Sequence, residues 1–320
     1  MRTTSILGIS SSFVLAAAAA CGPPQARSGG GDDVADIDAG STDPDADHTQ
    51  WPGDGSMATG CTKLDLLFVI DNSGSMGQEQ ANLIANFPQF ISVLDASGLD
   101  YRVAVTTTAR QYTYTMQLPF GPATQVNTGA GDNGAMLKPS SCNMTKRWID
   151  KGDPNPAQTF SCVANVGTNG NADEMPLGAM RDAFEDRMMD NTNAGFRRPD
   201  SLLGVVFLTD EEDCSYEQPV TLSFTQSLCD AQMEPAANYV AFLDQYTGHR
   251  SRWAAAAIAG MGPGACSSTF GDAAEATRLK AFVQQAGAQA RMSSICDGDL
   301  SVSLAQVVDL LDTACGGVIF

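Results

Sequence analysis

The chain has 320 residues, with 37 Asp and Glu against 18 Lys and Arg, so its formal net charge at pH 7 is −19. Binding of nucleic acid through phosphate contacts needs a basic face, and this balance therefore argues against a nucleic-acid-binding protein. Beyond the first twenty residues, no stretch approaches the roughly 20 apolar residues that a membrane-spanning helix requires.

The N-terminal segment is predicted to be a signal peptide covering residues 1–20. Arg2 supplies a positive charge, residues 6–20 are apolar or small, and Cys21 follows a run of alanines. This arrangement resembles the lipobox of bacterial lipoproteins, which implies that Cys21 is lipidated and anchors the protein to the outer membrane. The alternative is an ordinary secretory signal and a freely secreted protein.

Residues 21–60 are predicted to form a disordered acidic linker after the lipidated Cys21. The segment combines Gly, Ser and Pro with few large apolar residues, so it cannot bury enough surface to fold. Its aspartates repel one another and extend the chain. These are Asp32, Asp33, Asp36, Asp38, Asp43, Asp45, Asp47 and Asp54.

An apolar run within Leu64–Asp71 predicts the first strand of the folded part. A run of this length, ended by a turn, is typical of a strand buried on both faces in a parallel sheet. Asp71, Ser73 and Ser75 then alternate in a small polar loop. Open α/β sheets bind their ligands at the carboxyl ends of such strands. A carboxylate and two hydroxyls are hard oxygen ligands that suit Mg²⁺, Mn²⁺ or Ca²⁺.

The rest of the chain alternates predicted helices and strands, apart from a Gly-, Pro- and Asn-rich stretch at 107–171 that predicts an edge strand and an insertion over the site. Helices are predicted at Gln78–Leu94 (interrupted or kinked at Pro88), Glu174–Met189, Ala236–Tyr246, Ala273–Ala286 and Ser303–Cys315. Strands are predicted at Tyr101–Thr106, Leu202–Thr209, Trp253–Ile258 and Arg291–Ser294. Such alternation predicts one α/β domain at 61–320, with a doubly wound, mostly parallel sheet and helices on both faces.

Asp71-Asn72-Ser73-Gly74-Ser75 resembles the D-x-S-x-S motif of von Willebrand factor type A (vWA) domains, which opens a metal-ion-dependent adhesion site. The resemblance covers roughly 61–320. The family's second loop, an Asp after a later strand, matches Asp210, and its Thr from a Gly-rich loop matches Thr168, with Asn171 as a substitute.

The resemblance implies a divalent metal site formed by Asp71, Ser73, Ser75, Thr168 and Asp210, with Mg²⁺ as the first candidate and Ca²⁺ or Mn²⁺ as alternatives. An open coordination position would then attract a carboxylate of a partner protein.

Three further acidic residues, Glu211, Glu212 and Asp213, follow Asp210 directly. Extra carboxylates near the cation would favour Ca²⁺ and repel an acidic partner. Alternatively, they cap the next turn or face solvent.

Nine cysteines are present, and lipidation of Cys21 would leave eight, an even number typical of disulfides in an exported protein. Eight cysteines allow 105 connectivities. Pairing of neighbours around insertions is the simplest arrangement, with the remaining pair joining the two ends of the domain. It gives Cys142–Cys162, Cys214–Cys229, Cys266–Cys296 and Cys61–Cys315. Zinc is disfavoured, because the chain has no C-x-x-C motif and only two His.

The predicted function is that of a cell-envelope protein, not an enzyme, which binds a partner protein through its metal site. A serine hydrolase is disfavoured, because His48 lies in the linker and only His249 could serve as base. A hydrolase of unrecognised type that uses the acidic loop, and a structural vWA domain with an empty site, are the alternatives.

Overall fold

A computed structural model defines residues 60–216, 219–230, 233–269, 271–298 and 300–318. The predicted signal peptide, Cys21 and nearly all of the acidic linker lie outside these residues and stay predictions. Within the defined part of the chain, no helix is both long enough and apolar enough to cross a membrane.

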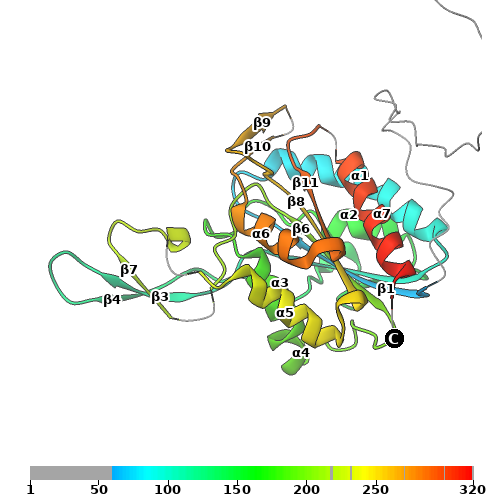
Figure 1. The fold of residues 1–320 in the computed structure, drawn as a ribbon, viewed down its shortest axis with the longest axis horizontal. Coiled ribbons are helices and arrows are strands. Elements are labelled where there is room, and N and C mark those ends of the chain that lie inside the picture. Colours follow the sequence, from blue (N-terminus) through cyan, green and yellow to red (C-terminus); the bar gives the residue numbers. More distant parts are fainter. Residues whose placement is uncertain (1–59, 217–218, 231–232, 270, 299, 319–320) are drawn as a thin grey trace, which may run out of the picture. The chain divides into compact units, whose positions relative to one another are not determined.

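A six-stranded sheet in the order β11-β8-β6-β1-β2-β5 forms the centre of the domain (Figure 1). The short edge strand β5 runs antiparallel to β2, and the other five strands are parallel. The strands are β1 (Lys63–Ile70), β2 (Asp100–Thr107), β5 (Ile149–Asp150), β6 (Leu202–Leu208), β8 (Trp253–Ala259) and β11 (Ala290–Ser294). The predicted α/β class with a mostly parallel sheet is confirmed.

The order of the strands places the ends of β1 and β6 side by side. The chain builds outward from β1 to β2 and β5, and then returns to the other side of β1 to form β6, β8 and β11. Ile70 pairs with Leu208 in the parallel register, and the backbone N–H of Asp71 donates to the carbonyl of Leu208 at 2.8 Å. Strands are added first on one side of β1 and then on the other, so the carboxyl ends of β1 and β6 lie side by side at the point where this change occurs.

Helices pack on both faces of the sheet. Successive side chains of β1 point to opposite faces, so β1 contributes to a hydrophobic core on each side. Leu66 and Phe68 belong to the core that includes α1 and α7, whereas Leu67 belongs to the core that includes α3, α5 and α6. The helices are α1 (Gly77–Ala96), α2 (Pro156–Val163), α3 (Pro176–Phe184), α4 (Asp186–Met189), α5 (Ala236–Thr247), α6 (Thr277–Ala286) and α7 (Ser301–Gly316). Single 3₁₀ turns lie at Ser140–Cys142, Leu228–Asp230, Arg250–Arg252 and Gly287–Gln289.

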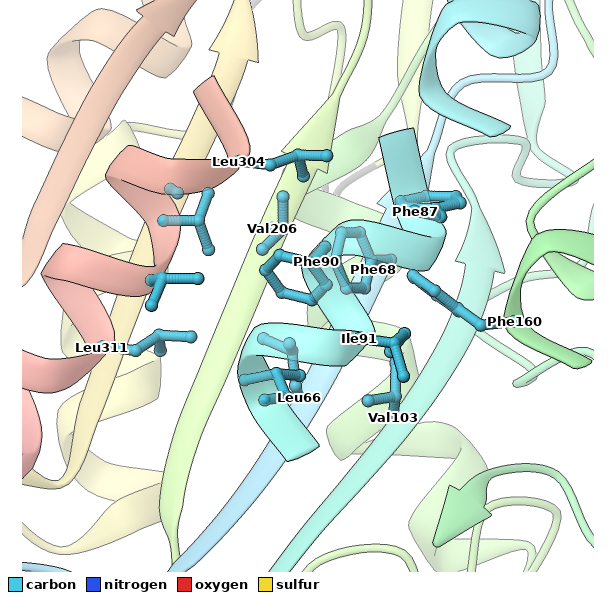
Figure 2. Close-up of a cluster of buried hydrophobic side chains, with 14 of the residues drawn as sticks. Leu66, Phe68, Phe87, Phe90, Ile91, Val103, Phe160, Val206, Leu304 and Leu311 are labelled. Atoms are coloured by element: carbon cyan, nitrogen blue, oxygen red, sulfur yellow. The ribbon is translucent and has the colours of Figure 1, made fainter. Parts of the chain in front are cut away.

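Phe68 is the centre of an aromatic cluster that fixes α1 and α2 against β1 (Figure 2). Its ring centroid lies 5.6 Å from those of Phe87 and Phe90 on α1 and 4.9 Å from that of Phe160 on α2. The helix α1 continues past Pro88, so the predicted interruption there is wrong.

The stretch at 107–171 contains the predicted edge strand, β5, and contributes two strands to a separate small sheet. This sheet has the order β4-β3-β7 and extends away from the six-stranded sheet (Figure 1). Its strands are β3 (Thr113–Gln117), β4 (Thr124–Asn127) and β7 (Val220–Ser223).

Two predicted helices differ from the observed ones at their ends. The helix predicted from Ala273 begins at Thr277, because β10 (Gly271–Ala273) pairs with β9 (Cys266–Ser268). The helix predicted from Glu174 begins at Pro176 and is divided from α4 at Glu185. Proline disfavours helical backbone in the residue before it, so Glu174 is left in the preceding loop.

All four predicted disulfides are present, and they are typical of an exported protein. Cys142–Cys162 joins the 3₁₀ turn at Ser140–Cys142 to α2, while Cys61–Cys315 joins the start of the domain to α7. The other two are Cys214–Cys229 and Cys266–Cys296.

Candidate metal centre

Asp71 lies at the carboxyl end of β1 and is completely buried. Its Oδ1 accepts a hydrogen bond from the backbone N–H of Ser73 at 2.7 Å, and its Oδ2 accepts one from Thr209 Oγ1 at 2.6 Å. Thr209 directly follows β6. The loops after β1 and β6 are therefore joined through this one carboxylate.

Four of the five predicted metal ligands lie together at the carboxyl ends of β1 and β6. The hydroxyl oxygens of Ser73 and Ser75 are 3.0 Å apart. The side chains of Ser75 and Asp71 both lie close enough to the carboxyl group of Asp210 to influence its pKa. Two carboxyl groups and two hydroxyls therefore lie near one another.

The fifth predicted ligand, Thr168, lies in a loop that touches the site but is itself exposed. The Gln80 side-chain amide donates both to the carbonyl of Gly167 at 2.7 Å and to that of Asp71 at 2.9 Å. The proposed substitute, Asn171, donates instead to the carbonyl of Arg110 at 2.8 Å. The loop is therefore where the sequence places it, and a role for Thr168 stays a prediction.

Glu174 is a site residue that the sequence analysis missed. It is 0% exposed, one of its carboxylate oxygens accepts a hydrogen bond from Thr108, and the other, Oε1, has no hydrogen-bond partner. Burial, and next the charge of Asp71, raise the pKa of Glu174 to about 9. The available signal was Pro176, which fixes the start of α3 and leaves an acidic residue in the loop before it.

The carboxyl groups near the ends of β1 and β6 lack a positive counter-charge among the described residues. Burial, followed by the charge of Asp71, raises the pKa of Asp210 to about 7 and also raises that of Glu211. Burial raises the pKa of Asp71 itself, against hydrogen bonds from Thr209 and Ser73. No Lys or Arg in the defined residues forms a salt bridge with these groups or with Glu174.

Asp65 lies on β1, the strand that ends just before Asp71, and gives a comparison with a buried carboxylate whose partners are all supplied by the protein. Asp65 is also completely buried, but Arg198 donates to it at 2.8 Å and Ser201 donates to its second oxygen. Buried charges are normally paired in this way or bind metals. Among the described residues, Asp71 forms no such pair with arginine or lysine.

In the described part of the chain, three buried carboxylate oxygens that lie near Asp71 have no hydrogen-bond partner. They are Asp210 Oδ1, Glu174 Oε1 and Glu79 Oε2, the last from the first turn of α1. Buried polar atoms without partners are rare in folded proteins and call for a missing water or ion. Together with the hydroxyls of Ser73 and Ser75, they make an oxygen-only donor set that fits a hard divalent cation.

The three acidic residues that follow Asp210 have two different environments. The carboxylate of Glu212 accepts hydrogen bonds from the backbone N–H groups of Thr277 at 2.9 Å and Arg278 at 3.0 Å, which start α6. Asp213 accepts from the N–H of Leu177 in α3 and pairs with the Arg278 side chain at 2.9 Å. Glu212 and Asp213 therefore cap helices, whereas Glu211 lies close enough to Asp71 for the charge of Asp71 to raise its pKa.

No protein-family model matches this chain, and no curated protein sequence matches it. Among solved structures, it is similar to the pilus adhesin SpaC from Lactobacillus rhamnosus GG, at 11% identity and a TM-score of 0.45, over 80% of this chain and 31% of that one. It is also similar to proximal thread matrix protein 1 from the mussel byssus, at 10% identity and a TM-score of 0.40, over 80% of this chain and 49% of that one. The chain spans less than half the length of either protein. At these TM-scores the likenesses carry no weight here.

Proposed function

We propose that residues 61–320 form a vWA-type domain that binds a divalent cation through a site of the metal-ion-dependent adhesion type. The observation that carries this proposal is the group of buried carboxyl groups without a positive partner. Asp71, Ser73, Ser75 and Asp210 supply the ligands, and Thr168 is the further candidate from the third loop.

The strand order supports the doubly wound arrangement. The strands β2 and β5 are added on one side of β1 and the later strands β6, β8 and β11 on the other side. Helices pack on both faces of the sheet. Asp71 and Asp210 follow these two strands, so the proposed ligands lie at the switch point where such sheets bind their ligands.

The cation would let the domain bind a partner protein without catalysing a reaction. The hydroxyls of Ser73 and Ser75 carry no charge, so a cation held by Asp71 and Asp210 alone keeps affinity for one more oxygen ligand. An acidic side chain of a partner protein would supply it. For this set of ligands Mg²⁺ is the first candidate, because it tolerates a mixed shell with waters, and Ca²⁺ or Mn²⁺ is the alternative.

Substitution of Asp71 by alanine should abolish cation binding and leave the fold intact. Asp71 joins the loops after β1 and β6 but pairs with no arginine or lysine among the residues that the structure describes, so its loss removes a ligand and relieves repulsion. We expect calorimetric titration with Mg²⁺, Mn²⁺ and Ca²⁺ to show a loss of at least roughly 100-fold in affinity.

The matched control is Asp200→Ala, which makes the same change in charge at an exposed aspartate paired with Lys63. It should bind cations like the wild type, and circular dichroism should show folded protein for both variants. Capture of partner proteins from envelope extract should need the cation and fail with chelator. Equal cation binding by Asp71→Ala and the wild type would refute the site.

A hydrolase that uses the acidic loop is the alternative function. Glu212, its main candidate, has both carboxylate oxygens engaged at the start of α6, and His249 is an exposed residue that caps a 3₁₀ turn. These contacts favour the binding module. Peptidase or glycosidase activity that is lost in Glu212→Ala would reverse that preference. Absence of cation binding in the wild type would instead support a structural vWA domain with an empty site.

We propose further that the domain is exported and tethered by lipid on Cys21 to the outer membrane, with secretion as the alternative. The four disulfides support export, and the small residues before Cys21 support lipidation. A fatty-acid probe should label the wild type but not Cys21→Ala. Labelling of both, or of neither, would contradict the anchor and leave the metal site unaffected.

A further inference from the structure

Glu174 provides a carboxylate in the loop where the resemblance to vWA domains implies a neutral threonine. We infer that Glu174 is a direct ligand of the cation and makes the site select Ca²⁺ over Mg²⁺. This inference rests on the proposed metal site and assigns its specificity.

The backbone of Glu174 is held between the ends of the two strands that flank β1. The N–H of Met175 donates to the carbonyl of Thr108, directly after β2, at 3.3 Å. The carbonyl of Glu174 accepts from the N–H of Cys214, in the loop after β6, at 2.7 Å. Because β1 lies between β2 and β6 in the sheet, Glu174 spans the end of β1, where Asp71 lies.

The side chain of Glu174 is oriented for a ligand that the protein itself does not supply. Thr108 Oγ1 donates to Oε2 and thereby fixes the carboxylate, as outer-shell groups do for metal ligands. Oε1 is buried and has no partner. An ionised oxygen in that state is unfavourable unless a cation binds it. The raised pKa of Glu174 has burial and the nearby charge of Asp71 as its main causes, which agrees with this position.

A third carboxylate changes which cation fits the site. Ca²⁺ accepts six to eight oxygens in flexible geometry, with carboxylates bound through one or both oxygens, whereas Mg²⁺ requires a compact octahedron and keeps several waters. Asp71, Asp210 and Glu174 together bring three negative charges and up to six oxygens. Such a shell suits Ca²⁺ better than the Mg²⁺ that Asp71, Asp210 and the two hydroxyls alone would favour.

Titration of the full chain with CaCl₂ and MgCl₂ tests this inference. We expect the wild type to bind Ca²⁺ at least about tenfold more tightly than Mg²⁺. Glu174→Thr should lose at least about tenfold in Ca²⁺ affinity and much less in Mg²⁺ affinity, so that the ratio of the two affinities approaches one. Glu174→Gln keeps the shape of the side chain and should show the same change in ratio if the threonine variant does not fold.

The control is Glu185→Thr, the same substitution at an exposed glutamate just after α3, which should leave both affinities unchanged. An unchanged ratio of Ca²⁺ to Mg²⁺ affinity in both Glu174 variants would overturn the inference and leave the metal site standing. A wild type that prefers Mg²⁺ would also overturn it. If the wild type binds neither cation, both this inference and the proposed function fail.

Discussion

Cation binding should release at least one proton at pH 7, and the affinity should rise on the order of 1000-fold between pH 6 and pH 8. A ligand carboxylate must be ionised, whereas the metal-free protein holds Glu174 with a pKa of about 9 and Asp210 with one of about 7. The incoming cation therefore displaces the proton of Glu174 and part of that of Asp210. Titration in buffers that differ in ionisation enthalpy counts these protons directly.

The same shifts predict how the stability of the metal-free protein depends on pH. Folding raises the pKa of Asp210 from 3.8 to about 7 and that of Glu174 from 4.5 to about 9. The stability from these protonated groups is therefore complete below about pH 4 and is lost as the pH rises through 7 and then 9. In chelator, the midpoint of thermal unfolding should fall from pH 5 to pH 9, and saturating cation should remove that fall.

Asp71→Ala is the informative variant for this pH dependence. The charge of Asp71 is the second largest cause of the raised pKa of both Glu174 and Asp210, after burial. Its removal should flatten the decline in stability in chelator. A wild type whose stability is independent of pH, and whose cation binding releases no proton, would show that these carboxyl groups are already ionised.

Removal of the Cys61–Cys315 disulfide should cause the largest loss of stability that we expect from any one bridge. Its cysteines are 254 residues apart, and the loop-closure entropy removed from the unfolded chain corresponds to about 5 kcal/mol. Cys315 is also completely buried in the core formed with α7. Urea unfolding of the double variant Cys61→Ala/Cys315→Ala measures the loss without leaving an unpaired thiol.

Cys142–Cys162 is the matched control, because its cysteines are only 20 residues apart and the same calculation gives about 3 kcal/mol. The double variant Cys142→Ala/Cys162→Ala should therefore lose less stability than the variant of the long bridge. An equal or reversed order would show that chain entropy does not set the contribution of these disulfides.

The central strands and two of the site's loops could be predicted because they depend on local pattern. An apolar run that ends in Asp71, and another that ends before Asp210, are recognisable as buried parallel strands without any knowledge of the rest of the chain. Parallel strands bring their carboxyl ends to one edge, so the meeting of Asp71 and Asp210 follows. The three short disulfides follow in the same way, from neighbouring cysteines around insertions.

The loop that contains Thr168 and Glu174 could not be predicted, because its conformation depends on contacts between distant segments. Glu174 is held near Asp71 by hydrogen bonds with Thr108, 66 residues earlier, and with Cys214 in the loop after β6. The sequence around Thr168 resembles a ligand loop more closely, yet Thr168 is exposed. Spacing along the chain gives no information about whether Thr168 or Glu174 lies near Asp71.

By itself, then, the sequence determined the strand–helix alternation, the two aspartates at the strand ends and the disulfide pairs, since periodicity and the rules of parallel pairing act over short stretches. Only the tertiary structure decided that Glu174 is buried near Asp71 and that Glu212 and Asp213 cap helices instead. The physical reason is that all these carboxylates have the same intrinsic chemistry. Which of them gains backbone N–H donors, and which is left buried without a partner, depends on how the helices α3 and α6 pack against the ends of the strands.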